Sequence, residues 1–187
     1  MKPHPAALPL LASLLGFGCA TPSAPPAYVA TTLQPTTGNT ATGTVWFIAD
    51  GADVRIRGRV SGLKPNQEHG LHVHEKGDCS SGDGMSAGGH FNPAGKPHGP
   101  PGGEHHAGDL PALKADASGS AAVDARVGGL AGGPNDYAGK ALVVHLNPDD
   151  YTTQPTGNSG ARIACGVIAA AAPRDGAGQL LPLPRDQ

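Results

Sequence analysis

The segment Glu68-His69-Gly70-Leu71-His72-Val73-His74-Glu75 is the most informative stretch of this 187-residue chain. His72 and His74 flank Val73, and alternate side chains of a strand lie on the same face of a sheet. The two imidazoles can therefore approach one ion from the same side. Neutral imidazole suits copper and zinc better than it suits hard cations. The segment predicts a strand that supplies part of a metal site.

Histidines are concentrated around this segment. Nine occur in the chain, and seven of them fall between residues 69 and 106. His90, His98, His106 and Asp109 lie in a stretch so rich in glycine and proline that we expect little regular structure there. A long irregular loop inside a compact domain normally has a function. Together with His145, these residues predict a binuclear metal site whose ions replace the missing backbone hydrogen bonds.

The composition indicates an all-β fold. The chain contains 29 glycines and 19 prolines, only 4% of its residues are aromatic, and short valine-containing segments recur. In residues 54–60 apolar residues alternate with arginines, which predicts a strand with one buried and one solvated face. The same criteria predict strands at 44–48, 121–127, 141–146 and 161–168. Their spacing favours a sandwich or a barrel.

The first twenty residues are typical of an export signal. Lys2 is followed by an apolar stretch, 8–17, that is too short to span a membrane comfortably. Cleavage after Ala20 would fit the small residues Gly18 and Ala20, whereas cleavage before Cys19 would produce a lipoprotein. Both routes remain open.

The remaining segments fall into three parts. Residues 21–27 are rich in proline, serine and threonine and predict a flexible linker. We expect one domain over 28–170, and a disordered tail over 171–187 where periodicity is lost. The net charge of −2 and the isoelectric point near 6.5 give no support to nucleic-acid binding.

Six separated motifs resemble the Cu/Zn superoxide dismutase family in order and spacing, from about Val29 to Ile168. They are His-x-His, Gly-Gly-His-Phe-Asn-Pro, His-Gly, His-x-Gly-Asp-Leu, Val-Val-His and Gly-Asn-Ser-Gly-Ala-Arg-Ile-Ala-Cys-Gly-Val-Ile. The resemblance implies a Greek-key β-barrel or sandwich, immunoglobulin-like, with long metal-binding loops. It also implies copper and zinc as cofactors, and the disproportionation of superoxide to dioxygen and hydrogen peroxide in a bacterial, exported enzyme.

The resemblance assigns roles to individual residues. It implies the copper ligands His72, His74, His90 and His145. It implies the zinc ligands His90, His98, His106 and Asp109, so that His90 bridges the two ions and carries a proton during catalysis. The other implied residues are Asp149, linking a copper histidine to a zinc histidine, Arg162 beside the copper, and a disulfide between Cys79 and Cys165.

The other three histidines receive no ligand role. His69 matches a structural position of the family, His105 is a loop neighbour, and His4 lies in the leader. Although His105 and His106 are adjacent, the spacing to Asp109 favours His106 as the zinc ligand.

Two features concern the surroundings of the site. Tyr151 to Ser159 contains no lysine or glutamate, so the attraction of superoxide would depend on Arg162 and on Lys76 or Lys96. If Cys79 and Cys165 pair, Cys19 is left over in an oxidising compartment, and lipidation would explain it. We therefore expect a periplasmic protein, possible lipid attachment to a membrane through Cys19, and a monomer or a homodimer.

Two other classes of protein would fit parts of this pattern. A copper- or zinc-binding protein without turnover would be expected to have lost a ligand or the arginine, and here all six histidines, Asp109 and Arg162 are present. A purely structural secreted β-domain would not need an aspartate among its histidines. Visible spectroscopy after copper loading would separate these classes.

Overall fold

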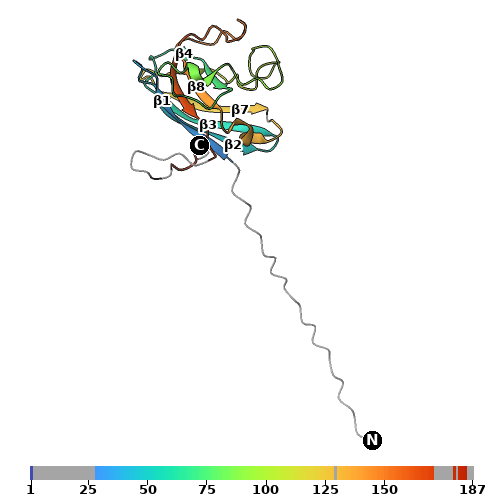
Figure 1. Cartoon of the computed structure of the whole chain (residues 1–187). Helices are drawn as coiled ribbons and strands as arrows, with labels where there is room; N and C mark the ends of the chain where they lie inside the picture. Colours follow the sequence, from blue (N-terminus) through green and yellow to red (C-terminus); the bar gives the residue numbers. More distant parts are fainter. Residues whose placement is uncertain (2–27, 129, 171–178, 180, 185–187) are drawn as a thin grey trace.

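The computed structural model describes residues 1, 28–128, 130–170, 179 and 181–184. Within them the chain forms β-strands and two short 3-10 helices, shown in Figure 1. The strands are β1 Tyr28–Pro35, β2 Thr42–Asp50, β3 Asp53–Ser61, β4 Glu68–His69, β5 Leu71–His74, β6 Leu113–Lys114, β7 Ala121–Gly128, β8 Ala141–His145 and β9 Arg162–Val167. The helices are η1 Met85–Ala87 and η2 Gly133–Tyr137.

Seven of these strands form one antiparallel sheet in the order β5-β8-β9-β1-β2-β3-β7. Strands β1, β2 and β3 follow one another as a meander, but β3 then pairs with β7, and β5 lies at the opposite edge beside β8. Figure 1 shows that the sheet curls on itself. The structure confirms the expected all-β fold of Greek-key type.

The core lies inside this curled sheet. It is filled by the apolar side chains that point inward from alternate positions of the strands. Val45 and Phe47 of β2 and Ile56 of β3 are all 0% exposed, and the Phe47 ring lies 5.1 Å from that of Tyr137. The five predicted strands are found, with ends shifted by up to two residues. Strand β1 was not predicted, because no clear alternation of polar and apolar residues marks Tyr28–Pro35.

The predicted solvated arginine face of residues 54–60 is only partly correct. Arg59 is exposed as expected, but the side chain of Arg57 is only 11% exposed. Its guanidinium donates a hydrogen bond to the carbonyl of Pro184, at 3.4 Å, near the C-terminus of the chain. The pattern within the strand carries no information about this distant contact.

Edge strand β5 binds the long loop that follows it. The backbone N–H of Phe91 donates to the Val73 carbonyl, and the N–H of Val73 donates to the Gly108 carbonyl, both at 2.8 Å. Isolated bridges also join His74 to His90 and His72 to Asp109. The loop therefore covers an edge that would otherwise be open, and it brings its polar side chains next to those of β5.

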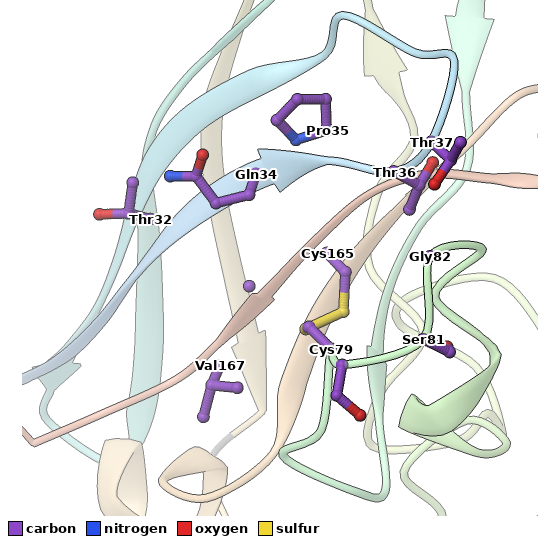
Figure 2. A pocket seen from close by; sticks show the side chains of 12 residues that line it. Thr32, Gln34, Pro35, Thr36, Thr37, Cys79, Ser81, Gly82, Cys165 and Val167 are labelled. Atoms are coloured by element: carbon purple, nitrogen blue, oxygen red, sulfur yellow. A yellow bond between two sulfur atoms is a disulfide. The ribbon is translucent and has the colours of Figure 1, made fainter.

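A disulfide fixes the first part of this loop to the sheet. Cys79 and Cys165 of β9 are joined, as Figure 2 shows, with their Cα atoms 5.8 Å apart. Beneath it, Ala87, Ala141 and Val143 form a small buried cluster with Cys165. The pocket of Figure 2 lies beside the disulfide and contains none of the histidines.

The predicted leader and linker, including Cys19 and Ala20, lie outside the described residues, as does most of the predicted tail. The boundaries of the domain stay a prediction. In the part of the chain that the structure describes, none of the helices has the length and apolar character needed to cross a membrane.

Candidate metal centre

Four buried histidines from three parts of the chain meet at one end of the sheet. His72 and His74 come from β5, His145 is the last residue of β8, and His90 is bridged to His74. One ring nitrogen of each lies within 4.8 Å of the others. The closest measured pair is His74 Nε2 and His145 Nε2, at 3.3 Å.

The opposite ring nitrogens of three of these histidines bind acceptors, which fixes their orientation. His74 Nδ1–H donates to the Gly88 carbonyl at 2.9 Å, and His145 Nδ1–H donates to the Gly160 carbonyl at 3.2 Å. His72 instead directs Nε2 to an Asp149 oxygen at 2.6 Å. Because a carbonyl can only accept, Nε2 of His74 and of His145 is left as a lone-pair donor toward the cluster.

Some nitrogens that face the cluster have no hydrogen-bond partner. Among the described residues, this is true of His72 Nδ1 and His90 Nε2, both of which are buried. A buried polar atom without a partner is costly, and native structures rarely keep one without a reason. A metal ion bound by these nitrogens would remove the cost, so the donor set fits copper held by four imidazoles.

A second group is centred on Asp109. Its Oδ1 lies 2.9 Å from His90 Nδ1, 3.0 Å from His98 Nδ1 and 3.2 Å from His106 Nδ1. Its Oδ2 accepts hydrogen bonds from the backbone N–H groups of Gly99 and His106, at 3.2 and 3.0 Å. Three imidazole nitrogens and one carboxylate oxygen form the donor set that zinc prefers.

His72 also lies close enough to be grouped with His90, His98 and Asp109. The reason is that its ring stacks on that of His90, with centroids 3.9 Å apart. However, Asp149 occupies one nitrogen of His72, and the other belongs to the first group. His106, whose Nδ1 lies 3.2 Å from the same carboxylate oxygen as His90 and His98, stays the predicted fourth ligand of the second group.

His105 lies apart from both groups. Its Nδ1–H donates to the carbonyl of His106 at 2.6 Å, and its side chain is half-buried in the loop. The structure thus brings together all eight of the positions predicted as ligands or as their link, and it leaves His105 aside. The assignment of each residue to a particular ion stays a prediction.

Asp149 contacts one histidine of each group. Oδ2 lies 2.6 Å from His72 Nε2, and Oδ1 lies 2.9 Å from His98 Nε2. The N–H of Tyr151 also donates to Oδ1, at 2.8 Å. Gly157 packs against this carboxylate with φ of 63°, and a Cβ there would overlap both Asp149 and His98. One carboxylate therefore sets the positions of two candidate ligands to two different ions.

Arg162, at the start of β9, is the cation next to the first group. Nη1 donates to the Gly84 carbonyl at 2.8 Å, and Nη2 donates to the Gly88 carbonyl at 2.6 Å. Lys76 and Lys96 are both exposed. Sequence reasoning missed the glycine carbonyls, because any residue carries a carbonyl and none leaves a signal in the sequence.

Comparison with known proteins relates this chain to one protein family and to solved structures. The family model described as copper/zinc superoxide dismutase matches residues 41–168, which is more than half of the chain. The chain belongs to the copper/zinc superoxide dismutase family. Among solved structures it is similar to the clock protein EA4, with 37% sequence identity and a TM-score of 0.69, over 78% of this chain and 96% of that one.

Burial favours the metal-binding forms of the candidate ligands in this member of the superoxide dismutase family. It lowers the pKa of His72 well below its usual value, that of His74 to about 2 and that of His145 to about 4. Burial alone would raise the pKa of Asp109, but hydrogen bonds from His90 and from the Gly99 N–H hold it well below its usual value. Near neutral pH these three imidazoles are uncharged and the Asp109 carboxylate is ionised, which are the forms that bind metals.

Proposed function

We propose that this member of the family is an active superoxide dismutase. The reaction converts two superoxide anions and two protons into one dioxygen and one hydrogen peroxide. One anion gives up an electron and the other receives it. The single observation that carries the proposal is the presence of two adjacent buried donor groups that share His90, with Arg162 beside the first.

The donor sets suggest which ion each group would hold. Copper would be held by His72, His74, His90 and His145, and zinc by His90, His98, His106 and Asp109. Copper would supply the one-electron chemistry, because zinc has no redox activity. Zinc would hold His90 in place and order the loop.

His90 is the residue that we expect to move a proton. Its Nδ1 faces Asp109 at 2.9 Å, while Nε2 is the buried nitrogen that faces the copper group. A proton held at Nε2 would lie next to the anion as it becomes peroxide, where general acid catalysis needs it. Asp149 would keep His72 and His98 in their orientations throughout the reaction.

Arg162 would attract and orient the substrate anion. The protein carries a net charge of −2, so attraction of superoxide requires a local positive field, as is known for superoxide dismutases. A guanidinium fixed by two carbonyls offers further N–H donors in a planar geometry. Burial lowers the pKa of Arg162, and the nearby Asp83 carboxylate raises it and so favours the cation, although its negative charge also weakens the local positive field. Lys76 and Lys96 would add positive charge from the surface.

The decay of superoxide tests the proposal. Protein loaded with both copper and zinc should accelerate the decay catalytically, whereas protein loaded with zinc alone should not. Metal analysis should give one ion of each kind per chain. Stoichiometric binding of both ions without turnover would instead indicate a metal-binding protein that is not an enzyme. The similarity to a structure described as a clock protein is compatible with that second role.

We also propose export to the periplasm, with residues 1–20 as the signal. Lysine at position 2, the apolar stretch and Cys19 support it. Intact mass of the protein from the membrane and soluble fractions distinguishes cleavage after Ala20 from lipid on Cys19. A soluble mass that begins at Thr21 contradicts the anchored form. The same preparations would show whether the protein is a monomer or a homodimer.

A further inference from the structure

Trp46 lies on the outer face of the sheet, yet it is only 8% exposed. Its neighbours Val45 and Phe47 point into the core at 0% exposure, so strand alternation puts Trp46 on the opposite face. Trp46 pairs with Ala30 on β1 and with Arg57 on β3. Ala30 is 2% exposed, and the Arg57 side chain is 11% exposed. This part of the outer face is therefore covered.

Residues 181–184, with the sequence Leu-Pro-Leu-Pro, lie at this face. Arg57 Nη1 donates to the Pro184 carbonyl at 3.4 Å, across 127 positions of sequence. Pro184 also lines the same surface hollow as Trp46, Arg57 and Asp124. A segment at the end of the chain thus contacts the strands near its beginning.

The exposure of this segment follows the pattern of an extended chain on a surface. Leu181, Leu183 and Pro184 are partly buried, whereas Pro182 is exposed. Proline fixes φ near that of the polyproline II conformation, so little conformational entropy is lost when such a segment binds. Aromatic-lined surfaces are the usual partners of proline-rich segments.

The hollow also contains an unpaired donor. Within the described residues, the indole Nε1–H of Trp46 is buried and has no acceptor. Polyproline II segments form no internal hydrogen bonds, so their carbonyls are free to accept. With residues 181–184 in place, the guanidinium of Arg57 donates to the Pro184 carbonyl. The indole N–H keeps its capacity to donate, so this face presents two groups that can only donate to a segment whose carbonyls can only accept.

We propose that the outer face of β1, β2 and β3 around Trp46 is a docking groove for a proline-rich extended segment, and that residues 181–184 of this chain occupy it. The segment acts as a strap that covers Trp46, the one aromatic side chain in a hollow otherwise lined mostly by polar and charged residues. The proposal does not depend on the metal centre or on its activity.

Fluorescence tests the strap directly, because Trp46 is the single tryptophan of the chain. The full chain is compared with a chain that ends at Gly178, both loaded with metals. Without the strap, tryptophan emission should shift to longer wavelength, and the acrylamide quenching constant should rise several-fold. Identical emission and quenching in the two proteins would overturn the proposal.

Two substitutions that preserve chain length keep the test valid if the shortened chain does not fold. Leu183→Ser changes a partly buried residue of the strap and should raise quenching toward that of the shortened chain. Pro182→Ala changes the exposed neighbour and should leave quenching close to that of the full chain. Circular dichroism and metal content serve as checks on the fold. Wild-type quenching in Leu183→Ser refutes the strap.

Protein concentration distinguishes a strap within one molecule from an exchange between two copies. If residues 181–184 occupy the groove of their own chain, quenching stays constant on dilution. Protection that disappears on dilution would assign the occupant to a second copy and would overturn the intramolecular strap.

Discussion

The sheet and the loop between β5 and β6 differ in what holds them in place. Strand β2 pairs with β3 along its whole length, and Val45, Phe47 and Ile56 fill the core without exposure. Residues 75–112 contain only the single helical turn Met85–Ala87 among regular elements. Their polar centre is Asp109, which faces three imidazoles with one oxygen and two backbone N–H groups with the other.

The difference shows that two kinds of interaction hold different regions of the same chain in a defined conformation. Backbone pairing and apolar burial order the sheet, whereas the loop combines a few backbone hydrogen bonds to β5 with carboxylates, imidazoles and a disulfide. Changes in the sheet should therefore be measured as loss of folding stability. Changes of the imidazoles and carboxylates in the loop should be measured first as loss of metal and activity, whereas loss of the disulfide, which ties the loop to the sheet, should lower folding stability. The predictions below test this separation.

The largest effect is expected for His90→Ala. It removes one ligand from each donor group and the atom that would carry the proton, so superoxide decay should fall to nearly the uncatalysed rate. The circular dichroism spectrum of His90→Ala should still show the β-sheet of the wild type. The matched control is His105→Ala in the same loop, which should retain both metals and most activity. Wild-type turnover of His90→Ala with both metals bound would show that His90 does not bridge.

Cys79→Ser should have the next largest effect. The disulfide closes a loop with a sequence separation of 86, which on the chain-entropy model stabilises the fold by about 4.6 kcal/mol at most. Denaturant unfolding should show most of this loss, and hydrogen exchange should increase first around residues 76–90. Ser80→Ala, an exposed neighbour, is the control. Wild-type stability in Cys79→Ser would mean that the loop is held by other contacts.

Arg162→Glu tests whether the charge beside the first donor group attracts the substrate. The second-order rate constant should fall by about 10-fold to 10³-fold while the metal content changes little. Arg162→Lys should lose less. Added salt should slow the wild type, since the Debye length is about 8 Å at physiological ionic strength, and it should slow the Glu variant less. If salt slows the wild type and Arg162→Glu equally, the attracting charge lies elsewhere, and Lys76 and Lys96 are the next residues to test.

The smallest effect is expected for Gly157→Ala. Its control is Gly51→Ala, because both glycines have the same backbone conformation. Gly157 beside Asp149 has φ of 63°, and Gly51 in the β2–β3 turn has φ of 64°. Alanine at either site costs about 1–2 kcal/mol for the left-handed backbone. Only at Gly157 would the added Cβ overlap Asp149 and His98, because the space around Gly51 is open.

The measurement is zinc retention against a chelator. Gly157→Ala should lose zinc faster than the wild type, whereas Gly51→Ala should retain it and lose only stability. If the two variants retain zinc equally, the link through Asp149 does not control the second donor group.

Much of the fold could be predicted from the sequence, because its signal is local. Alternation in Val54-Arg55-Ile56-Arg57 predicts β3, and the family resemblance supplied the Greek-key arrangement. The cluster could be predicted for a similar reason, since histidine is uncommon and His72 and His74 must share a face. Strand β1 was missed because Ala30, Thr31 and Thr32 show no such alternation.

The orientation of each imidazole could not be predicted. It depends on the carbonyls of Gly88 and Gly160, which lie 14 and 15 positions from the histidines that they bind, and on Asp149, which lies 77 positions from His72. The burial of Arg57 depends likewise on Pro184, 127 positions away. Such contacts exist only once the chain has folded.

The carbonyl of Gly88 accepts from two donors of different kinds, His74 Nδ1 at 2.9 Å and Arg162 Nη2 at 2.6 Å. A single peptide group thus aligns an imidazole of the first donor group with the cation beside that group. If this peptide rotated, both side chains would lose an anchor at the same time. The positions of His74 and Arg162 are therefore coupled, so the orientation of the imidazole and that of the guanidinium should be gained or lost together.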